Sequence, residues 1–208
     1  MLDNGLMAHY GKLEYWEDRY SKRTEPFDWY QVYTGIKEII SPLIEKENKI
    51  LNVGCGNSRM SEEMYEDGYE NITNIDFSNK AISQMEDRCR SKYPKLIFKM
   101  MDVTDMKDFE TGTFNTVIDK GTLDSILSTD DPIINSEKMI NEIYRILSPG
   151  SVFISITYGD PEHRKKHFMK LPWAKFLYEK VIKHTSSSEP LDENDPKNYH
   201  FVYIMTKG

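Results

Sequence analysis

The sequence of 208 residues has few cysteines, no long apolar run and no excess of positive charge. Its two cysteines, Cys55 and Cys89, do not suffice for a disulfide framework, so we expect a cytoplasmic protein, with the nucleus left open. No run reaches the roughly 20 apolar residues of a membrane span, and the first residues lack the order of a secretory signal. The net charge of −7 disfavours a protein that binds nucleic acid through a broad basic surface.

The middle of the sequence alternates strand-like and helical segments, which is typical of an α/β fold with a parallel sheet. Helices are expected over about 58–68, from Ser78 as the N-cap towards Arg90, and over 136–147, where the apolar residues fall on one face. Strands are expected over 49–53, 71–76, 96–102, 114–119 and 151–157. The length fits a single domain.

The pattern changes after residue 157. Residues 161–168 are a basic segment, either helix or loop, and we interpret His163 and His167, which flank its basic cluster, as solvent-exposed. A strand is expected in the second half of 175–185, a polar loop over 186–198 and a strand over 199–207. The two strands predict an antiparallel hairpin that completes the sheet.

Glycines and acidic residues follow the ends of successive strands. Because ligands bind beyond the carboxyl ends of parallel strands, these residues are expected to share one site. They are Gly54 and Gly56 after the first strand, Asp76 after the second, Asp102 after the third, and Asp119 with Lys120 after the fourth.

The spacing of these residues narrows the class of ligand. Gly54 and Gly56 alone fit a tight turn as well as a site, and Arg59 stands where the dinucleotide pattern requires a third glycine. Asp76 lies 20 residues after Gly56, the position of a carboxylate that accepts hydrogen bonds from two ribose hydroxyls. The pattern therefore favours a nucleoside ligand without a pyrophosphate.

Aromatic residues are concentrated between positions 15 and 33. They are Tyr15, Trp16, Tyr20, Phe27, Trp29, Tyr30 and Tyr33. This segment is either a helix that packs over the sheet or a lid whose rings close over a ligand, and the sequence leaves both readings open.

The blocks LNVGCGNS, NIDFS, MMDVTDM and VIDKGTLDSIL resemble the signature of class I methyltransferases, which use S-adenosylmethionine. With the opening EYWEDRY…PFDWY and the ending YHFVYIMTKG, the similarity runs from about Tyr15 to Gly208 and extends to the branch that methylates lysines of translation elongation factor 1-alpha. The resemblance implies a Rossmann-like α/β fold with a mostly parallel seven-stranded sheet, helices on both faces and a C-terminal antiparallel hairpin. It implies one methyltransferase domain over 1–208, with an aromatic lid segment (1–35), a cofactor-binding core (49–157) and a substrate-side segment (158–208).

The resemblance also implies roles for individual residues. The expected cofactor contacts are Gly54 and Gly56 at the methionine part, Asp76 at the ribose, Phe77, Asp102 and Val103 at the adenine, Lys120 from the fourth strand, and Trp16, Tyr20 and Trp29 as aromatic residues that close the pocket. Asn52 departs from the pattern, because many class I enzymes have an acid at that position. No metal is expected.

The expected substrate is a protein lysine, with elongation factor 1-alpha as the partner of an otherwise monomeric enzyme that binds neither nucleic acid nor membrane. Candidates for orienting the amine are Asp119, Asp124 and Tyr158, and Asp119 fits a role in turn geometry equally well. Two other functions stay open: a methyltransferase of small molecules, and an inactive cofactor-binding scaffold protein.

Overall fold

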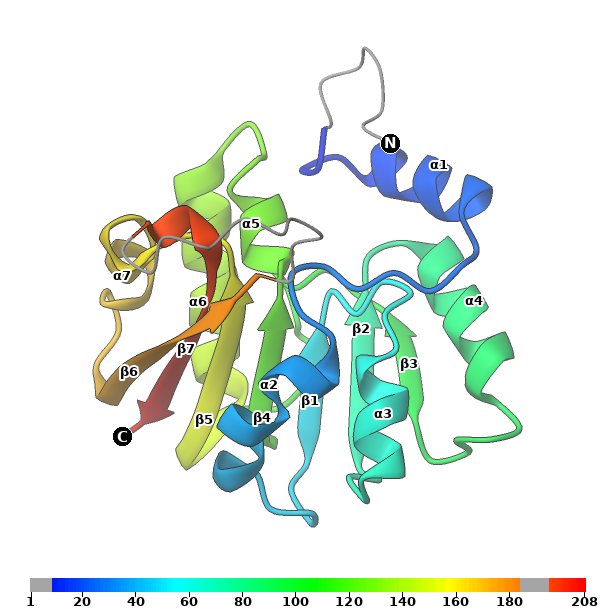
Figure 1. Cartoon of the computed structure of the whole chain (residues 1–208), viewed down its shortest axis with the longest axis horizontal. Coiled ribbons are helices and arrows are strands. Elements are labelled where there is room, and N and C mark those ends of the chain that lie inside the picture. Colours follow the sequence, from blue (N-terminus) through cyan, green and yellow to red (C-terminus); the bar gives the residue numbers. More distant parts are fainter. Residues whose placement is uncertain (1–8, 184–194) are drawn as a thin grey trace.

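The computed structural model describes residues 9–183 and 195–208, and a single sheet of seven strands runs through this part of the chain (Figure 1). The strand order is β3-β2-β1-β4-β5-β7-β6. The strands are β1 (Ile50–Val53), β2 (Ile72–Asp76), β3 (Ile97–Met100), β4 (Phe114–Lys120), β5 (Leu147–Thr157), β6 (Trp173–Ile182) and β7 (Tyr199–Lys207). Strands β1 to β5 pair in parallel, whereas β7 lies antiparallel between β5 and β6. The predicted α/β sheet with its antiparallel C-terminal hairpin is confirmed.

Helices cover both faces of this sheet. They are α1 (Leu13–Lys22), α2 (Tyr33–Ile40), α3 (Met60–Glu66), α4 (Asn79–Cys89), α5 (Thr122–Ile126), α6 (Pro132–Ile146) and α7 (Pro161–Phe168), with 3-10 turns η1 (Ser41–Leu43) and η2 (Pro196–Asn198). Apolar side chains of α2, α3 and α4 share one core with the sheet, and those of α6 and α7 share a second core on its other face. Figure 1 shows α2 and α3 in front of the strands and α6 behind them.

Local sequence signals account for several of these elements. The Ser78 side chain accepts a hydrogen bond from the backbone N–H of Ala81, which confirms the predicted N-cap of α4. In α6, Ile140 and Ile143 are buried, as the apolar face predicted. Asp160 caps α7 by accepting from the N–H of His163, so the basic segment 161–168 is a helix.

Tertiary contacts changed two predictions. Strand β6 spans the whole of Trp173–Ile182 rather than the second half of its segment, because β7 pairs with it from Lys207 to Tyr199. His167 is buried, with Nδ1 3.3 Å from the Ser136 hydroxyl, so the interpretation of this histidine as solvent-exposed was wrong. Of the predicted loop over 186–198, the residues up to 194 lie outside the described part of the chain.

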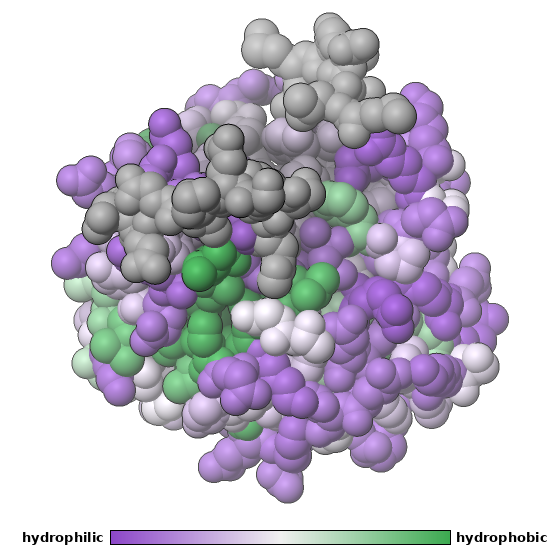
Figure 2. Space-filling view, in the orientation of Figure 1, coloured by the Kyte–Doolittle hydropathy of each residue, from purple (hydrophilic) through white to green (hydrophobic). Residues whose placement is uncertain are grey.

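The face of the molecule seen in Figure 2 is mainly hydrophilic. Figure 2 shows purple residues over the side of α3 and α4, whereas apolar residues gather left of the centre, on the side of β5 and β6. Exposed apolar side chains of β6 include Leu177 and Ile182. Within the described residues, no helix has the length and apolar character needed to cross a membrane.

Candidate active site

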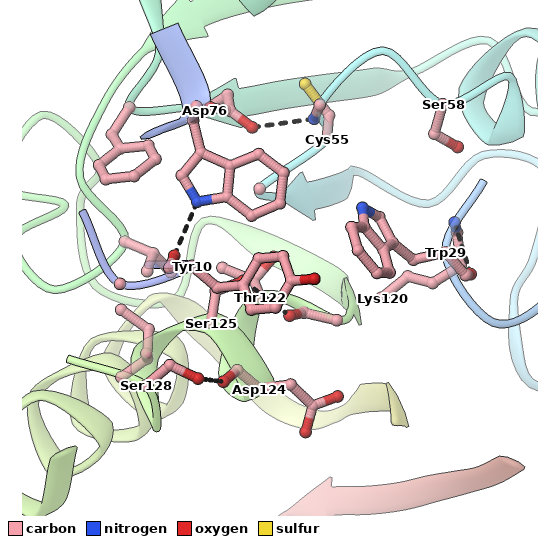
Figure 3. A pocket seen from close by; sticks show the side chains of 18 of the residues that line it. Tyr10, Trp29, Cys55, Ser58, Asp76, Lys120, Thr122, Asp124, Ser125 and Ser128 are labelled. Carbon is pink, nitrogen blue, oxygen red and sulfur yellow. Dashed lines mark hydrogen bonds between the residues drawn. The ribbon is translucent and has the colours of Figure 1, made fainter. Parts of the chain in front are cut away.

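A cavity of about 490 Å³ lies beyond the carboxyl ends of the parallel strands (Figure 3). This volume falls in the range of small-molecule sites in proteins. The chain between α1 and α2 crosses these strand ends (Figure 1), and Phe27, Trp29 and Tyr30 of this segment line the cavity. All ten residues expected to bind the cofactor line it, namely Trp16, Tyr20, Trp29, Gly54, Gly56, Asp76, Phe77, Asp102, Val103 and Lys120.

The loop after β1 requires glycine at two positions. Gly54 and Gly56 both adopt positive φ, at 59° and 52°. A Cβ at Gly54 would lie 2.0 Å from Oγ1 of Thr122, and a Cβ at Gly56 would lie 2.5 Å from the Tyr20 hydroxyl. Because glycine has no side chain, Thr122 of α5 and Tyr20 of α1 can approach the loop closely.

Asp76 forms the polar floor of the cavity at the end of β2. Its side chain is buried, and its two oxygens accept hydrogen bonds of 2.9 Å from the backbone N–H groups of Gly56 and Ser78. Burial raises the pKa of Asp76 to about 6, while these two hydrogen bonds favour the charged form. The carboxylate therefore stays ionised near pH 7 and keeps lone pairs for further donors, as ribose recognition requires.

The residues after β3 line the neighbouring wall. Oδ1 of Asp102 accepts hydrogen bonds of 2.8 Å from both the backbone N–H and the hydroxyl of Thr104. Val103 is buried, and Phe77 packs against the aromatic residues of α1. Asn52, the departure from the family pattern, also lines the cavity and donates to Ser61 and Asn74.

The aromatic residues of α1 belong to a helix that packs against the rest of the fold, and they also cover the cavity, so both interpretations of this segment apply. Trp16 and Tyr20 are stacked with their centroids 5.7 Å apart, and both are buried where they line the cavity. The helix is held on α4, because Glu17 accepts a 2.7 Å hydrogen bond from the Ser78 hydroxyl. Trp16 donates in turn to the backbone carbonyl of Tyr10, a lining residue that the sequence did not indicate.

Lys120 connects β4 to the N-terminal segment. Its ammonium is buried and donates to Oδ1 of Asp28 at 2.9 Å and to the carbonyl of Trp29 at 3.2 Å. Burial lowers the pKa of Lys120, and Asp28 opposes this effect. The partner Asp28 was missed, although its place among the aromatic residues of the segment was a usable signal. The direct contact of Lys120 with a cofactor stays a prediction.

Asp119 does not reach the cavity. It is fully buried, and its oxygens accept from the backbone N–H of Thr122 at 2.8 Å and from the Ser155 hydroxyl at 2.7 Å. Burial raises its pKa to about 7. The structure therefore supports the role of Asp119 in turn geometry, and its role in orienting a substrate amine stays a prediction.

Asp124 and Tyr158, the other two candidates, line the far end of the cavity. Oδ1 of Asp124 accepts from the Thr157 hydroxyl at 2.6 Å and from Nη2 of Arg164. Its Oδ2 is buried and accepts no well-formed hydrogen bond from the described residues, although the Tyr30 hydroxyl lies within reach of this carboxylate. Figure 3 shows the carboxylate projecting from α5 at the edge of the group of lining side chains.

Aromatic rings surround this carboxylate. Tyr30 has a φ of 64°, which is unusual for a residue other than glycine, and its ring lies 6.0 Å from that of Tyr158. Burial and the neighbouring Asp124 raise the pKa of the Tyr30 hydroxyl, so the phenol stays neutral. Tyr158 is half-exposed and stands at the opening of the cavity. Tyr30 was not among the predicted site residues, since only its unusual backbone directs the ring there.

Other nucleophiles and metal ligands do not define this site. The Cys55 thiol is buried, and burial raises its pKa well above the ordinary value, which makes it a poor nucleophile. Within residues 9–183 and 195–208, no three His, Cys, Asp or Glu side chains are grouped so that they could hold a metal ion.

Comparisons with known proteins agree with this geometry. Residues 44–200 match the family described as "Methyltransferase domain". The Mus musculus "eEF1A lysine and N-terminal methyltransferase" is 33% identical over 206 residues, which are 95% of this chain and 29% of that protein. The Mus musculus "EEF1A lysine methyltransferase 4" is 32% identical over 209 residues, 96% of this chain and 76% of that one. The chain thus spans less than a third of the first relative and about three quarters of the second.

Solved structures share the fold at low sequence identity. A Methanosarcina mazei protein described as a SAM-dependent methyltransferase has a TM-score of 0.60 at 19% identity, over 87% of this chain and 99% of its own. Phospholethanolamine N-methyltransferase 2 of Haemonchus contortus, solved with S-adenosylhomocysteine, has a TM-score of 0.63 at 12% identity, over 84% and 53%. With the match over residues 44–200, these findings confirm the resemblance: the chain belongs to the methyltransferase-domain family.

Proposed function

We propose that the chain is an S-adenosylmethionine-dependent methyltransferase that methylates a lysine side chain of a protein, with elongation factor 1-alpha as the substrate. One observation carries the proposal: a single cavity is lined by Asp76, whose carboxylate suits a nucleoside, and by Asp124, whose buried Oδ2 accepts no well-formed hydrogen bond from the described residues. The names of the relatives, which cite eEF1A, support the choice of substrate.

The residues at the strand ends fit the cofactor. Asp76 offers carboxylate lone pairs to ribose hydroxyls, and the Gly54–Gly56 loop presents backbone that no Cβ obstructs. S-adenosylmethionine supplies a methyl group on a positively charged sulfur, and the rings of Trp16, Tyr20 and Trp29 can stabilise a cation in a site that excludes water.

The acceptor amine has to be neutral when it reacts. Neutralising a lysine of ordinary pKa at pH 7 costs about 4.6 kcal/mol, and an apolar channel reduces this cost by disfavouring the ammonium. Tyr30 and Tyr158 provide such walls, and Oδ2 of Asp124 can accept a hydrogen bond from the amine and orient it. The nitrogen lone pair then forms the bond to the methyl carbon, the carbon–sulfur pair stays on sulfur, and the surplus proton leaves to water at the exposed side of Tyr158.

Calorimetry tests the cofactor part of the proposal. Wild-type protein is titrated with S-adenosylmethionine, and Asp76→Ala is expected to weaken binding strongly because it removes the carboxylate from the floor of the cavity. Equal affinities of the two proteins would contradict the assignment of this site.

Transfer of a radiolabelled methyl group tests the substrate. Labelled cofactor is added to the enzyme with purified elongation factor 1-alpha of the same host, and separately with a host lysate. Label on the elongation factor that disappears when the acceptor lysine is changed to Arg supports the proposal. Label confined to small molecules would favour a metabolite methyltransferase, and cofactor binding without transfer would favour a scaffold.

A cytoplasmic location, a monomeric state and the absence of nucleic acid partners belong to the same proposal. Support comes from the net charge of −7 and from two cysteines that are both free and buried. Light scattering of the purified protein tests the monomeric state, imaging of a tagged copy in cells tests the location, and a gel-shift assay with RNA and DNA tests nucleic acid binding.

A further inference from the structure

Arg164 of α7 is a buried cation beside the acceptor end of the cavity, and the proposed chemistry gives it no role so far. Its side chain is only 8% exposed. Nη2 donates to Oδ1 of Asp124, and Nε donates to the Thr157 hydroxyl at 3.2 Å. A buried guanidinium thus binds one oxygen of the carboxylate, whereas the other oxygen has only the Tyr30 hydroxyl near it and accepts no well-formed hydrogen bond in the described part of the chain.

The loop after β5 is shaped around this guanidinium. A Cβ at Gly159 would lie 2.3 Å from Nε of Arg164 and 2.4 Å from Cζ, so only glycine leaves room for the side chain. The carbonyl of Gly159 accepts a 2.9 Å hydrogen bond from Tyr203, and the Tyr158 ring lies 5.0 Å from Cζ. Hydrogen bonds to Asp124 and Thr157 and the contact with the Tyr158 ring therefore fix the arginine in the space that Gly159 leaves.

The charge of Arg164 matters for a reacting amine. A lone carboxylate within about 4–6 Å of an amine stabilises the ammonium form and raises the pKa of the amine. That effect would oppose the loss of the proton that methyl transfer requires. Pairing Asp124 with Arg164 cancels most of the negative charge but leaves the lone pairs of Oδ2, so the pair can orient the amine without holding its proton.

Other titratable groups around the pair are paired, neutral or remote from Oδ2. Lys120 is paired with Asp28, and Asp160 with His163. His200, whose ring lies beside Tyr30, is neutral above pH 5, because burial lowers its pKa to about 4. The remaining groups that face the pair from the N-terminal segment, β4, β5, α7 and β7 are Tyr30, Asp119, Tyr158, His167 and Tyr203. Burial raises the pKa of Asp119 to about 7, so the rates are compared above about pH 8, where the charge of this group no longer changes.

We infer that Arg164 is a positioning residue that acts through Asp124: it makes the amine-orienting carboxylate nearly neutral and thereby sets the pH at which the acceptor amine reacts. The inference rests on the proposed function and deepens it.

The pH dependence of methyl transfer tests this inference. Initial rates with elongation factor 1-alpha as acceptor are measured from about pH 8 to pH 10 for wild type and Arg164→Gln. Without the guanidinium, the uncompensated carboxylate raises the pKa of the amine, so the profile is expected to move about one unit towards alkaline pH, with about a tenfold lower rate at the acid end. Arg164→Lys, which keeps the charge, is expected to restore a profile near that of wild type.

Two further variants separate electrostatics from folding. Lys166→Gln removes a positive charge from an exposed position of the same helix and is expected to leave the profile unchanged. Gly159→Ala displaces Arg164 without altering any charge, and it is expected to shift the profile as Arg164→Gln does, which keeps the test valid if Arg164→Gln does not fold.

Calorimetry with S-adenosylmethionine accompanies each rate measurement, and the affinity is expected to stay at the wild-type value. If the rates of Arg164→Gln or Gly159→Ala depend on pH as those of wild type do, the inference is overturned, even where the rates themselves are lower. A residue with a purely structural role would lower the rate at every pH without shifting the pH dependence. Absence of transfer by the wild-type protein with cofactor bound would instead contradict the proposed function, and this inference with it.

Discussion

The two ends of the cavity are built in different ways. At the cofactor end, a glycine loop and Asp76 follow adjacent parallel strands, and the main contacts join residues close to those strand ends. At the acceptor end, the groups around Asp124 come from the N-terminal segment, α5, the end of β5 and α7. The polar contacts of the first end are therefore local to the sheet, with only its aromatic cover supplied by the N-terminal segment, whereas the polar contacts of the second end exist only when distant segments meet.

This difference predicts separable effects of mutation. Changes at the acceptor end should alter transfer and leave cofactor affinity intact, because the carboxylate of Asp124 lies at the far side of the cavity from Asp76. Changes at the cofactor end should weaken binding. A change at Asp119, which lies outside the cavity, should affect stability alone.

The largest effect is expected from Asp124→Asn. The amide cannot accept from Arg164, Thr157 and the amine together, so the amine loses its orientation and transfer should fall about 100-fold. Rates with elongation factor 1-alpha and calorimetry with S-adenosylmethionine measure the two effects separately. Glu162→Gln, an equal change of charge at an exposed position of α7, serves as the control. A parallel loss of rate and cofactor affinity in Asp124→Asn would remove the distinction between the two ends.

A smaller effect is expected from Gly56→Ala. The added Cβ meets the Tyr20 hydroxyl and occupies a left-handed backbone conformation, so cofactor affinity should fall about tenfold. Gly150→Ala is the matched control, because Gly150 also has positive φ, at 77°, but has no atom within 4 Å of its Cβ position. Equal affinities for the two variants would show that the close approach of Tyr20 to the loop is unimportant for binding.

The smallest effect concerns stability and pH. Burial raises the pKa of Asp119 to about 7, so the folded state holds this proton more tightly than the unfolded chain does between about pH 4 and 7. The contribution of this group to stability is therefore present below that window and is lost as pH rises through it. Thermal unfolding at pH 5 and pH 8 should show a smaller difference for Asp119→Asn than for wild type. An unchanged difference would place the pH dependence elsewhere.

Much of the cofactor end could be predicted from the sequence. Strand ends are visible in the pattern of apolar runs, and residues directly after them must gather at one edge of a parallel sheet. For this reason Gly54, Asp76 and Asp102 were expected in one site, and they line one cavity. The same reasoning misplaced Asp119, because the side chain of a strand-end residue can turn into the core and cap the next helix.

The acceptor end could be predicted only in part. Asp124 and Tyr158 were candidates because they lie near strand ends, but Arg164 was one basic residue among several in a charged helix. Its burial depends on Gly159 and on the position of α7 beside α6, which no short-range pattern reports. His167 was misread for the same reason.

The alternation of strands and helices, the glycine loop and the acids that follow the strands depend on local periodicity and backbone conformation, so they can be deduced from the chain alone. Which charges are paired follows only from the packed fold. Lys120 meets Asp28 and Asp124 meets Arg164 across 92 and 40 positions of the chain. Such pairs form when packing removes water from both partners, and packing is a property of the whole fold.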